Sequence, residues 1–318
     1  MTGPSFPHAG GVFSSDEFLT VLNRVWCDGR GELAPVAVGP YVVRTVVADG
    51  QPVLDVPFLD FFVPVQGVLA SFSGRYTPRV AVGDRPAAEH TTVDPLLVEP
   101  APYIRWRDFE SWDAVVAHWK KSERAIERES RRREKILVRD YGPLVYEFDD
   151  HDPKAFETCV DWKSKQFLSV GTYDPFADPR NEQLLRGLID AGIGRVSSLR
   201  AGNRIVAAHI GLDWDNTIHW WLPTYDEDAR SASPGRLLLQ RVLQLSYDRG
   251  DETFDFLRGS MFYKWIYATH FREVVEAGRR PWRRQLELTR AQAKRRFPGV
   301  ADAVRRARDK VTRRQAER

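Results

Sequence analysis

The sequence of 318 residues contains only two cysteines and two methionines. Cys27 and Cys159 lie far apart, so they cannot form a disulfide framework or a cysteine-rich zinc site, and they suit a reducing cytoplasm. No window has the roughly 18 uninterrupted apolar residues of a membrane-spanning helix, because even the stretch from Val53 to Ala70 contains Asp55 and Asp60. The start of the chain lacks a basic region followed by an apolar run. We therefore expect a cytoplasmic protein without a secretory signal.

Signatures of metal and nucleotide sites are also missing. The seven histidines include no pair at helical i, i+4 spacing and none has a cysteine at ligand spacing, so we expect no metal site. Walker A, dinucleotide-binding and nucleophile-elbow patterns are absent as well. These absences leave open a reaction in which one bound substrate attacks another directly, because such a reaction depends on positioning and charge stabilisation.

The formal net charge of +3 hides a strong asymmetry along the chain. Residues 279–318 contain 15 Lys and Arg against 4 Asp and Glu, a balance of +11, whereas the rest of the chain contains 32 against 40, a balance of −8. A basic tail of this kind suits an acidic carrier protein, a tRNA or an anionic membrane surface, and it equally suits a solvated helix end. The sequence alone does not choose between these partners.

The first part of the chain reads as a flexible terminus, residues 1–10, followed by a mixed α and β half, residues 11–110. Apolar spacing predicts a helix from Phe13 to Trp26 that Ser14 or Ser15 caps. Two β-branched segments joined by Ala48-Asp49-Gly50 predict a hairpin. Residues 84–100 contain several prolines and little periodicity, so we expect a long connection there, with room for a short strand at its end.

A basic helix is expected over residues 111–140, because apolar residues recur at helical spacing from Trp112 onward. Between Lys120 and Arg139 it contains nine Lys and Arg against four Glu. Two interpretations stay open for this segment. It is a solvated spacer with internal ion pairs, or it contacts a substrate or a phosphate group.

The second half, residues 141–278, has a regular order of elements that ends before the basic helical tail, residues 279–318. A strand and two helices are followed by three strands joined by short turns, a helix, a strand, a short helix and a last strand. These elements are expected at residues 144–148, 153–167, 181–191, 195–200, 204–213, 217–224, 235–249, 253–256, 262–267 and 271–277.

That order of elements resembles the GNAT acyltransferases. Two motifs sharpen the resemblance: Ser233-Pro234-Gly235-Arg236-Leu237-Leu238, and Asp255-Phe256-Leu257-Arg258-Gly259 followed by Tyr263-Lys264. They are similar to the group that contains Fem-type aminoacyl transferases and the acyltransferase-like proteins associated with polysaccharide synthesis. The resemblance spans roughly residues 111–279. It implies an α+β fold of two GNAT-like halves, each a mainly antiparallel mixed sheet flanked by helices.

The resemblance also implies where a donor binds. GNAT enzymes hold the pyrophosphate of acyl-CoA on backbone N–H groups at a helix start, where the helix dipole favours an anion. It places Ser233, Gly235, Arg236 and Leu237 at that start. Leu237 stands where the usual loop has a second small residue. The same residues also form an ordinary helix N-terminus, and that interpretation stays open.

The late motif supplies the candidate catalytic residues. Lys264 is the first choice, since a Lys stabilises an oxyanion or holds an anionic group, and Fem-type enzymes have a functional Lys in a similar aromatic-Lys pair. Asp255 orients Lys264, acts as a base or only ties down a turn. Arg258 lines the substrate pocket or pairs with Asp255. Tyr263 protonates a leaving thiolate or packs in the core.

The central strands add a candidate base and a pocket wall. His209 suits removal of a proton from an amine near neutral pH, and its alternative is a hydrogen-bonded core residue. Trp221, which alternation places on the same face as His219, and Tyr225 are expected to shape an acyl or acceptor pocket. An aromatic core is their alternative.

Together these features predict an N-acyltransferase that moves an acyl group from an acyl thioester, carried by CoA or an acyl-carrier protein, to a small-molecule or peptide amine by direct attack. One alternative is an aminoacyl-tRNA-dependent transferase. A second is a non-catalytic GNAT-fold scaffold in a biosynthetic assembly. The donor types differ in salt dependence, because contacts to a nucleic-acid backbone weaken steeply as salt rises.

Overall fold

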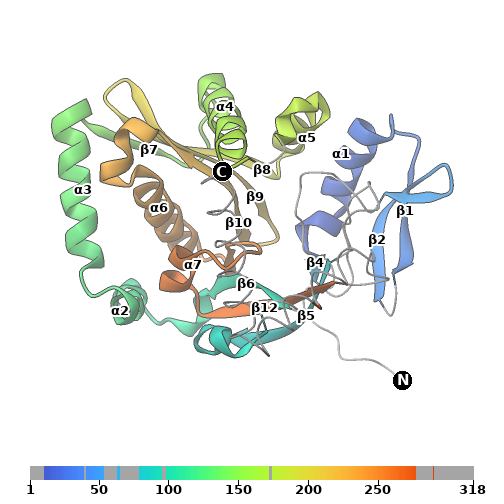
Figure 1. Ribbon diagram of the computed structural model, residues 1–318, viewed down its shortest axis with the longest axis horizontal. Helices are drawn as coiled ribbons and strands as arrows, with labels where there is room; N and C mark the ends of the chain where they lie inside the picture. The colour runs from blue at the N-terminus through green and yellow to red at the C-terminus, as the bar shows by residue number, and fades with distance from the viewer. Residues whose placement is uncertain are drawn as a thin grey trace, which may run out of the picture.

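The computed structural model describes residues 11–38, 41–53, 63–64, 79–94, 98–171, 174–276 and 289. Within these residues the chain forms a three-stranded sheet, β1-β2-β3, and a nine-stranded sheet in the order β4-β5-β12-β6-β11-β10-β9-β8-β7 (Figure 1). All described strand pairs are antiparallel except β10 with β11 and β4 with β5. The expectation of mainly antiparallel mixed sheets flanked by helices is confirmed.

The nine strands of the large sheet come from both halves of the chain. Their bounds are β4 Val63–Pro64, β5 Arg79–Pro86, β6 Val98–Arg105, β7 Leu144–Glu147, β8 Gly194–Ala201, β9 Arg204–Trp214, β10 Thr217–Tyr225, β11 Thr253–Asp255 and β12 His270–Glu276. β5 and β6 both pair with β12, and β6 also pairs with β11. The segment expected as a separate N-terminal half therefore completes the sheet of the second half, and the division into two GNAT-like halves stays a prediction.

Helices cover both faces of the central strands. They are α1 Asp16–Trp26, α2 Trp112–Ser122, α3 Ile126–Tyr141, α4 Pro153–Ser169, α5 Pro179–Asp190, α6 Pro234–Arg249 and α7 Phe262–Tyr267. α4 and α5 lie on one face of β8–β10, and α6 lies on the other face with α3 outside it (Figure 1). Separate buried clusters fill the two sides, with Cys159 and Ile210 in one and Leu238 and Phe254 in the other.

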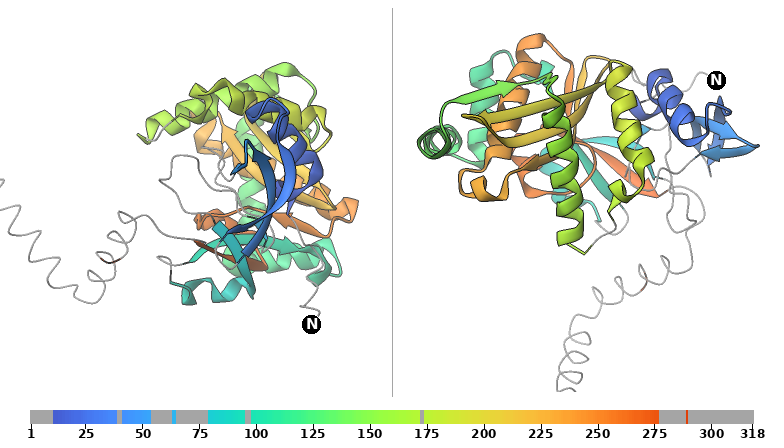
Figure 2. Two further views of the ribbon diagram at one scale, coloured as in Figure 1. Left: turned by 90° about the vertical axis from the view of Figure 1, so that its right-hand side faces the viewer. Right: turned by 90° about the horizontal axis from the view of Figure 1, so that it is seen from above.

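The N-terminal elements pack at the end of the sheet beside α5 (Figure 2). Ser15 caps α1 by accepting a hydrogen bond from the Phe18 N–H at 3.1 Å, as the sequence predicts. β1 (Glu32–Val38) pairs with β2 (Tyr41–Ala48), and β2 pairs with β3 (Gln51–Val53). Asp49 and Gly50 both have positive φ, which is the turn geometry that joins two-residue hairpins. The predicted hairpin is therefore confirmed.

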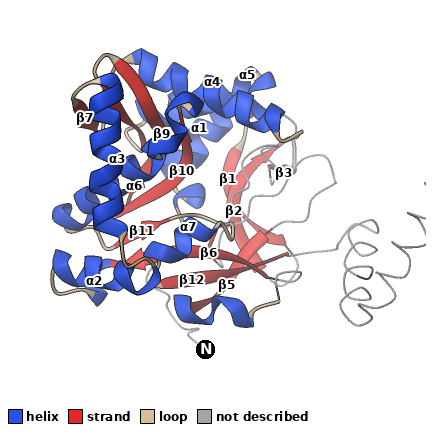
Figure 3. Ribbon diagram, turned by 60° about the vertical axis from the view of Figure 1, so that its left-hand side comes forward, coloured by secondary structure: helices blue, strands red, loops and turns tan. Residues whose placement is uncertain are grey.

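Two expectations about the middle of the chain are wrong. Residues 84–100 are not one long connection, because β5 continues to Pro86 and β6 begins at Val98. The basic segment is not one helix, because the chain leaves helical geometry at Glu123, where ψ is 90°, and α3 starts only at Ile126. The break lets the two helices take different directions, so that α2 packs beside α7 and α3 lies along α6 and β7 (Figure 3).

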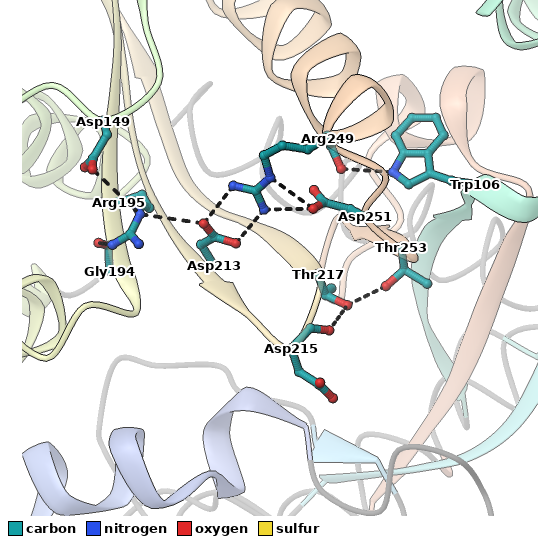
Figure 4. Close-up of polar contacts among 11 residues, drawn as sticks. Trp106, Asp149, Gly194, Arg195, Asp213, Asp215, Thr217, Arg249, Asp251 and Thr253 are labelled. Carbon is teal, nitrogen blue, oxygen red and sulfur yellow. Dashed lines mark hydrogen bonds and ion pairs between the residues drawn. The ribbon is translucent and has the colours of Figure 1, made fainter. Parts of the chain in front are cut away.

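An ionic clamp joins the end of α6 to the strand ends (Figure 4). The guanidinium of Arg249 donates to both oxygens of Asp213 at 2.9 and 2.8 Å and to Asp251 Oδ1 at 3.0 and 2.8 Å. Arg195 reaches Asp213 at 3.6 Å from the next strand. Because Arg249 lies in the last helical turn, its charge also interacts favourably with the helix dipole. The clamp fixes the axis of α6 relative to β9 and β11.

We expect Arg249→Ala to lower the free energy of unfolding by about 2 kcal/mol, because it leaves the buried Asp251 without its cation and Asp213 with only the more distant Arg195. Urea denaturation measures the loss. The matched control is Arg30→Ala, whose ion pair with Asp28 is 70% and 80% exposed and should contribute less than about 0.5 kcal/mol. Equal losses in the two variants would contradict the proposed role of the clamp.

Candidate active site

The candidate site lies where β10 and β11 separate. These parallel strands pair only from Thr217 with Thr253 to His219 with Asp255. Past that point β10 pairs with β9 alone, and its register shifts between His219 and Leu222, which marks a bulge. We call the place where these two strands part the opening; Gly235 at the start of α6 lies beside Tyr225 of β10, and the chain leaving β11 continues through a loop into α7.

Lys264 holds the loop that follows β11. Its ammonium group donates hydrogen bonds to the carbonyl oxygens of Leu257, at 3.2 Å, and Arg258, at 2.7 Å. The side chain is buried, and burial lowers the pKa of Lys264 to about 8, while the nearby Asp255 carboxylate raises it. Leu257 has φ of +56°, a left-handed conformation that is strained for a branched side chain. Lys264 therefore places a buried positive charge at the opening and stabilises a strained loop.

Asp255 has a structural role that the sequence left as one alternative. Its Oδ1 accepts from the Leu257 N–H at 2.7 Å, and its Oδ2 accepts from Arg272 at 2.5 Å. Asp255 is buried, so the carboxylate needs this cation to offset its desolvation. Asp255 and Lys264 thus both donate or accept hydrogen bonds that hold the turn at Leu257, and the negative charge of Asp255 raises the pKa of Lys264.

Arg272 is a member of the site that the sequence analysis missed. Its guanidinium lies 4.4 Å from the ring centroid of Tyr103, whose hydroxyl donates to Asp84 at 2.7 Å. Burial and the hydrogen bond to Asp84 raise the pKa of Tyr103. These residues belong to β5, β6 and β12. No local motif marks them, because only the sheet register brings the three strands together beside Asp255.

The expected pair of Arg258 with Asp255 is wrong. Arg258 forms an ion pair with Glu99 on β6 instead, and its side chain is 8% exposed. Burial lowers the pKa of Arg258 to about 10. Arg258 turns toward β6 because Arg272 already occupies the side of Asp255. Its position in the loop beside Lys264 stays compatible with the predicted substrate pocket.

His209 does not have the geometry of a catalytic base. Its Nε2 accepts a hydrogen bond from the Trp221 N–H at 3.1 Å, so the lone pair that would take a proton is already used. The ring stacks on Trp220 at 3.8 Å and is 1% exposed. Burial lowers the pKa of His209 well below its usual value, which keeps the ring neutral. The core alternative is the one that the geometry favours: His209 supports the bulge in β10.

Tyr263 also fits the core alternative better than the role of a proton donor. It packs against the α6 side of the sheet, with its ring 6.5 Å from that of Phe256. Burial raises the pKa of Tyr263, which makes its hydroxyl a weaker acid than an ordinary tyrosine.

Trp221 and Tyr225 lie on opposite sides of β10. Trp221 is half-buried and its ring makes an edge contact with Phe13 at 5.9 Å, and His219 contacts Phe13 at 6.5 Å. The expectation that Trp221 and His219 share a face is therefore confirmed. Tyr225 packs beside the first turn of α6, near Gly235. The two residues flank the opening but do not line one common wall.

The start of α6 has both features and obstacles for an anion. Ser233 adopts a left-handed conformation and makes no side-chain cap, and Gly235 leaves space beside Tyr225. Leu237 is buried. Arg236 is not turned outward, because it pairs with Glu123 and donates to the Tyr267 hydroxyl at 3.0 Å. The resemblance implies that backbone N–H groups hold the donor here, and the N–H groups of Arg236 and Leu237 already donate to the Ser233 carbonyl oxygen at 3.0 and 3.3 Å.

Arg133 of α3 is a second residue that the sequence analysis did not single out. Its Nε is buried and has no hydrogen-bond partner in the part of the chain that the structure describes. Burial, followed by the charge of Arg236, lowers the pKa of Arg133, so the two guanidinium groups lie close enough to repel. The basic composition of residues 120–139 indicates that a cation in this segment could contact a ligand. Only the packing of the helix shows that Arg133 is the cation that faces α6.

Residues 121–265 match the family "Acetyltransferase (GNAT) domain". The match confirms the resemblance over this range, which runs from the end of α2 into α7. No curated protein sequence matches the chain. Among the described residues we find no group of His, Cys, Asp or Glu that could hold a metal ion. The helices of the described segments are all too short or too polar to cross a bilayer.

Three solved structures are similar in fold. The crystal structure of FemX is 9% identical with a TM-score of 0.47, and the match covers 82% of this chain and 91% of that one. The C-terminal domain of a putative lysylphosphatidylglycerol synthetase from Agrobacterium fabrum is 12% identical with a TM-score of 0.45, covering 89% and 94%. A conserved protein of unknown function from Bacteroides thetaiotaomicron is 10% identical with a TM-score of 0.42, covering 83% and 92%.

The buried Lys264 should make stability depend on pH. Its pKa is about 8 in the fold and about 10.5 in the unfolded chain, so the unfolded state binds more protons between these values and stability rises with pH. We expect the wild type to gain about 2 kcal/mol over Lys264→Met between pH 7 and pH 10.

Urea denaturation of both proteins across this pH range measures the difference. Lys165→Met is the matched control, because Lys165 is 69% exposed and its removal should leave the pH dependence of the wild type unchanged. A difference between wild type and Lys264→Met that stays constant with pH would show that the Lys264 ammonium is as well solvated in the fold as in the unfolded chain.

Proposed function

We propose that the protein is an N-acyltransferase that moves an acyl group from a thioester to an amine, with the reaction at the separation of β10 and β11. The observation that carries the proposal is the buried ammonium of Lys264 at this opening, within a GNAT domain. The thioester is carried by CoA or by an acyl-carrier protein, and the amine belongs to a small molecule or a peptide. This proposal keeps the first choice made from the sequence.

The chemistry needs only what these residues supply. The neutral amine nitrogen attacks the thioester carbonyl carbon, the new C–N bond forms as the C–S bond breaks, and the proton that the nitrogen loses is balanced by the proton that the leaving thiolate takes up. Negative charge develops on the carbonyl oxygen during the attack. The positive charge of Lys264, held in a site of low dielectric, stabilises that charge more than it stabilises the neutral thioester. Binding of both substrates in the opening supplies the proximity.

Arg133 supports a phosphate-bearing donor. A buried guanidinium Nε without a partner is costly unless a ligand supplies an acceptor, and a phosphate oxygen is the acceptor that guanidinium groups bind best. Arg133 lies near Arg236 at the start of α6, where the helix dipole also favours an anion. A phosphate there would offset the repulsion between the two guanidinium groups.

One observation favours the second candidate, an aminoacyl-tRNA-dependent transferase. Arg236 already pairs with Glu123, and Leu237 is buried, so the loop lacks the open cradle expected for a CoA pyrophosphate. A donor bound mainly outside this loop, as a tRNA would be, needs no such cradle. Its affinity would fall steeply with salt, unlike that of a CoA thioester with its few phosphate groups.

Thermal-shift titration with acetyl-CoA, a long-chain acyl-CoA and free CoA tests the donor, because a ligand that binds only the folded state raises the melting midpoint. We expect one acyl-CoA to stabilise the wild type more than CoA does. Arg133→Gln should weaken this binding about tenfold, the loss of one charge-assisted hydrogen bond. Arg132→Gln is the control, since Arg132 is 56% exposed and pairs with Glu129. An unchanged melting midpoint with every CoA compound would indicate that the donor is a carrier protein or a tRNA.

Removal of the Lys264 charge should act on the chemical step. We expect Lys264→Met to lower kcat about 100-fold or more while the donor affinity changes little, because the charge acts on the developing oxyanion. Steady-state kinetics with the best donor, together with a thermal melt to confirm folding, measure this. A folded Lys264→Met protein with wild-type kcat would remove Lys264 from the mechanism. A wild type without transfer from any donor would favour the non-catalytic scaffold.

A further inference from the structure

The outward side of α3 has a row of cations that lack carboxylate partners. Arg128, Arg131 and Lys135 are exposed, and in the described parts of the chain none of them forms an ion pair. Their spacing of three and four residues places them on one side of the helix. We call these three residues the α3 basic face. Figures 1 and 3 both show α3 at the outside of the molecule, with α6 and β7 on its inner side.

Two adjoining hollows lie beside the α3 basic face. The larger, of about 560 Å³, is bounded by α3, β7 and α6, and the smaller, of about 210 Å³, by α2, α3 and α6. Both share the side chains of Arg131, Glu134 and Arg241, so they form one groove. Its floor is apolar, and Val138 on its rim is 48% exposed. The apolar residues of the floor are Trp112, Val116, Trp119, Ile126, Leu144 and Leu237.

The groove fits an acidic protein better than a nucleic acid. Glu127 and Glu134 line it, but Glu127 pairs with Lys120 and Glu134 lies 3.9 Å from Arg241, so the exposed cations of the α3 basic face stay available to attract an acidic partner. The aromatic faces that could stack on bases are already used: Arg241 lies 5.0 Å over the ring of Tyr146, and Trp112 makes an edge contact with Trp119 at 5.2 Å. An amphipathic helix with an apolar ridge and acidic flanks matches an apolar groove that is bordered by cations.

The groove also leads toward the candidate donor site. Leu237 and Gln240, from the first two turns of α6, lie in its wall. Arg133 is on the same helix as the α3 basic face but turns inward, toward Arg236. A partner seated in the groove lies beside the first two turns of α6; Arg133 lines neither hollow, so only an extended group that passes the start of α6 reaches its buried Nε.

We propose that the α3 basic face and the groove beside it dock an acidic, helical acyl-carrier protein, whose phosphopantetheine phosphate reaches Arg133. This inference rests on the proposed thioester-dependent function, and it chooses the carrier protein over free CoA as the main donor. The exposed cations supply attraction and orientation, and the apolar floor supplies the buried contact.

Direct binding to a bacterial acyl-carrier protein, in its apo and acyl-phosphopantetheine forms, tests the inference by fluorescence anisotropy at low and moderate salt. We expect the triple variant Arg128→Glu, Arg131→Glu, Lys135→Glu to bind the acyl form at least about tenfold more weakly than the wild type. The matched control has the same charge change elsewhere: Arg30→Glu, Lys154→Glu, Lys165→Glu should stay within about threefold. The pair Arg131→Ala, Lys135→Ala gives the same test should the triple variant fail to fold.

Three results would overturn the inference: no binding of the carrier by the wild type, an equal loss in both triple variants, or tighter binding of a tRNA probe that the α3 variant abolishes. Transfer assays with acyl-CoA separate this inference from the proposed function. A wild type that transfers from acyl-CoA but binds no carrier refutes the docking surface alone. A wild type that transfers from neither donor refutes the proposed function itself.

Discussion

The separation of two parallel strands is the constraint on which the rest of this structure depends. Hydrogen bonding between β10 and β11 ends at His219 and Asp255, so the backbone groups beyond that point need other partners. The Trp221 N–H finds one in His209 Nε2. Gly211 opposite the bulge is required as well, because a Cβ there would lie 2.3 Å from the His209 ring and 2.6 Å from the His219 carbonyl oxygen. His209 and Gly211 therefore keep the opening in its bulged form.

The other side of the opening depends on buried charge. Lys264 and Asp255 replace the missing strand contacts with hydrogen bonds to the backbone around Leu257, a residue in a strained conformation. Such strain persists only where the surrounding contacts outweigh its cost, and it concentrates at functional sites. A positive charge that burial has partly destabilised is also one that a developing oxyanion stabilises most. The structural role of Lys264 and the chemical role proposed for it thus have the same origin.

Local patterns in the sequence predicted much of the fold, because most elements of the second half are determined by residues close together in the sequence. The turns at 201–203 and 214–216 and the helix start at Ser233 are each determined by a few adjacent residues. β5 and β6 could not be placed in this way, since they pair with β12, which follows more than 160 residues later. The same long range explains why Arg272, Tyr103 and Glu99 escaped sequence analysis, whereas Lys264 and Asp255, which share one motif, did not.

The basic residues of α3 fall into two groups, one that faces the interior and one that stays exposed. A run rich in Arg and Lys does not tell which cations face inward, but the helical period of α3 does. Ile126, Arg133 and Leu137 recur at seven and four residues and turn toward α6, with Ile126 and Leu137 fully buried. Arg128, Arg131 and Lys135 fall on the other side and stay exposed. The break at Glu123 sets this phase, because it ends α2 and lets α3 begin with its own orientation, and the carboxylate of Glu123 holds Arg236 at the start of α6. The exposed and the inward-facing cations of the segment therefore lie on different sides of one helix.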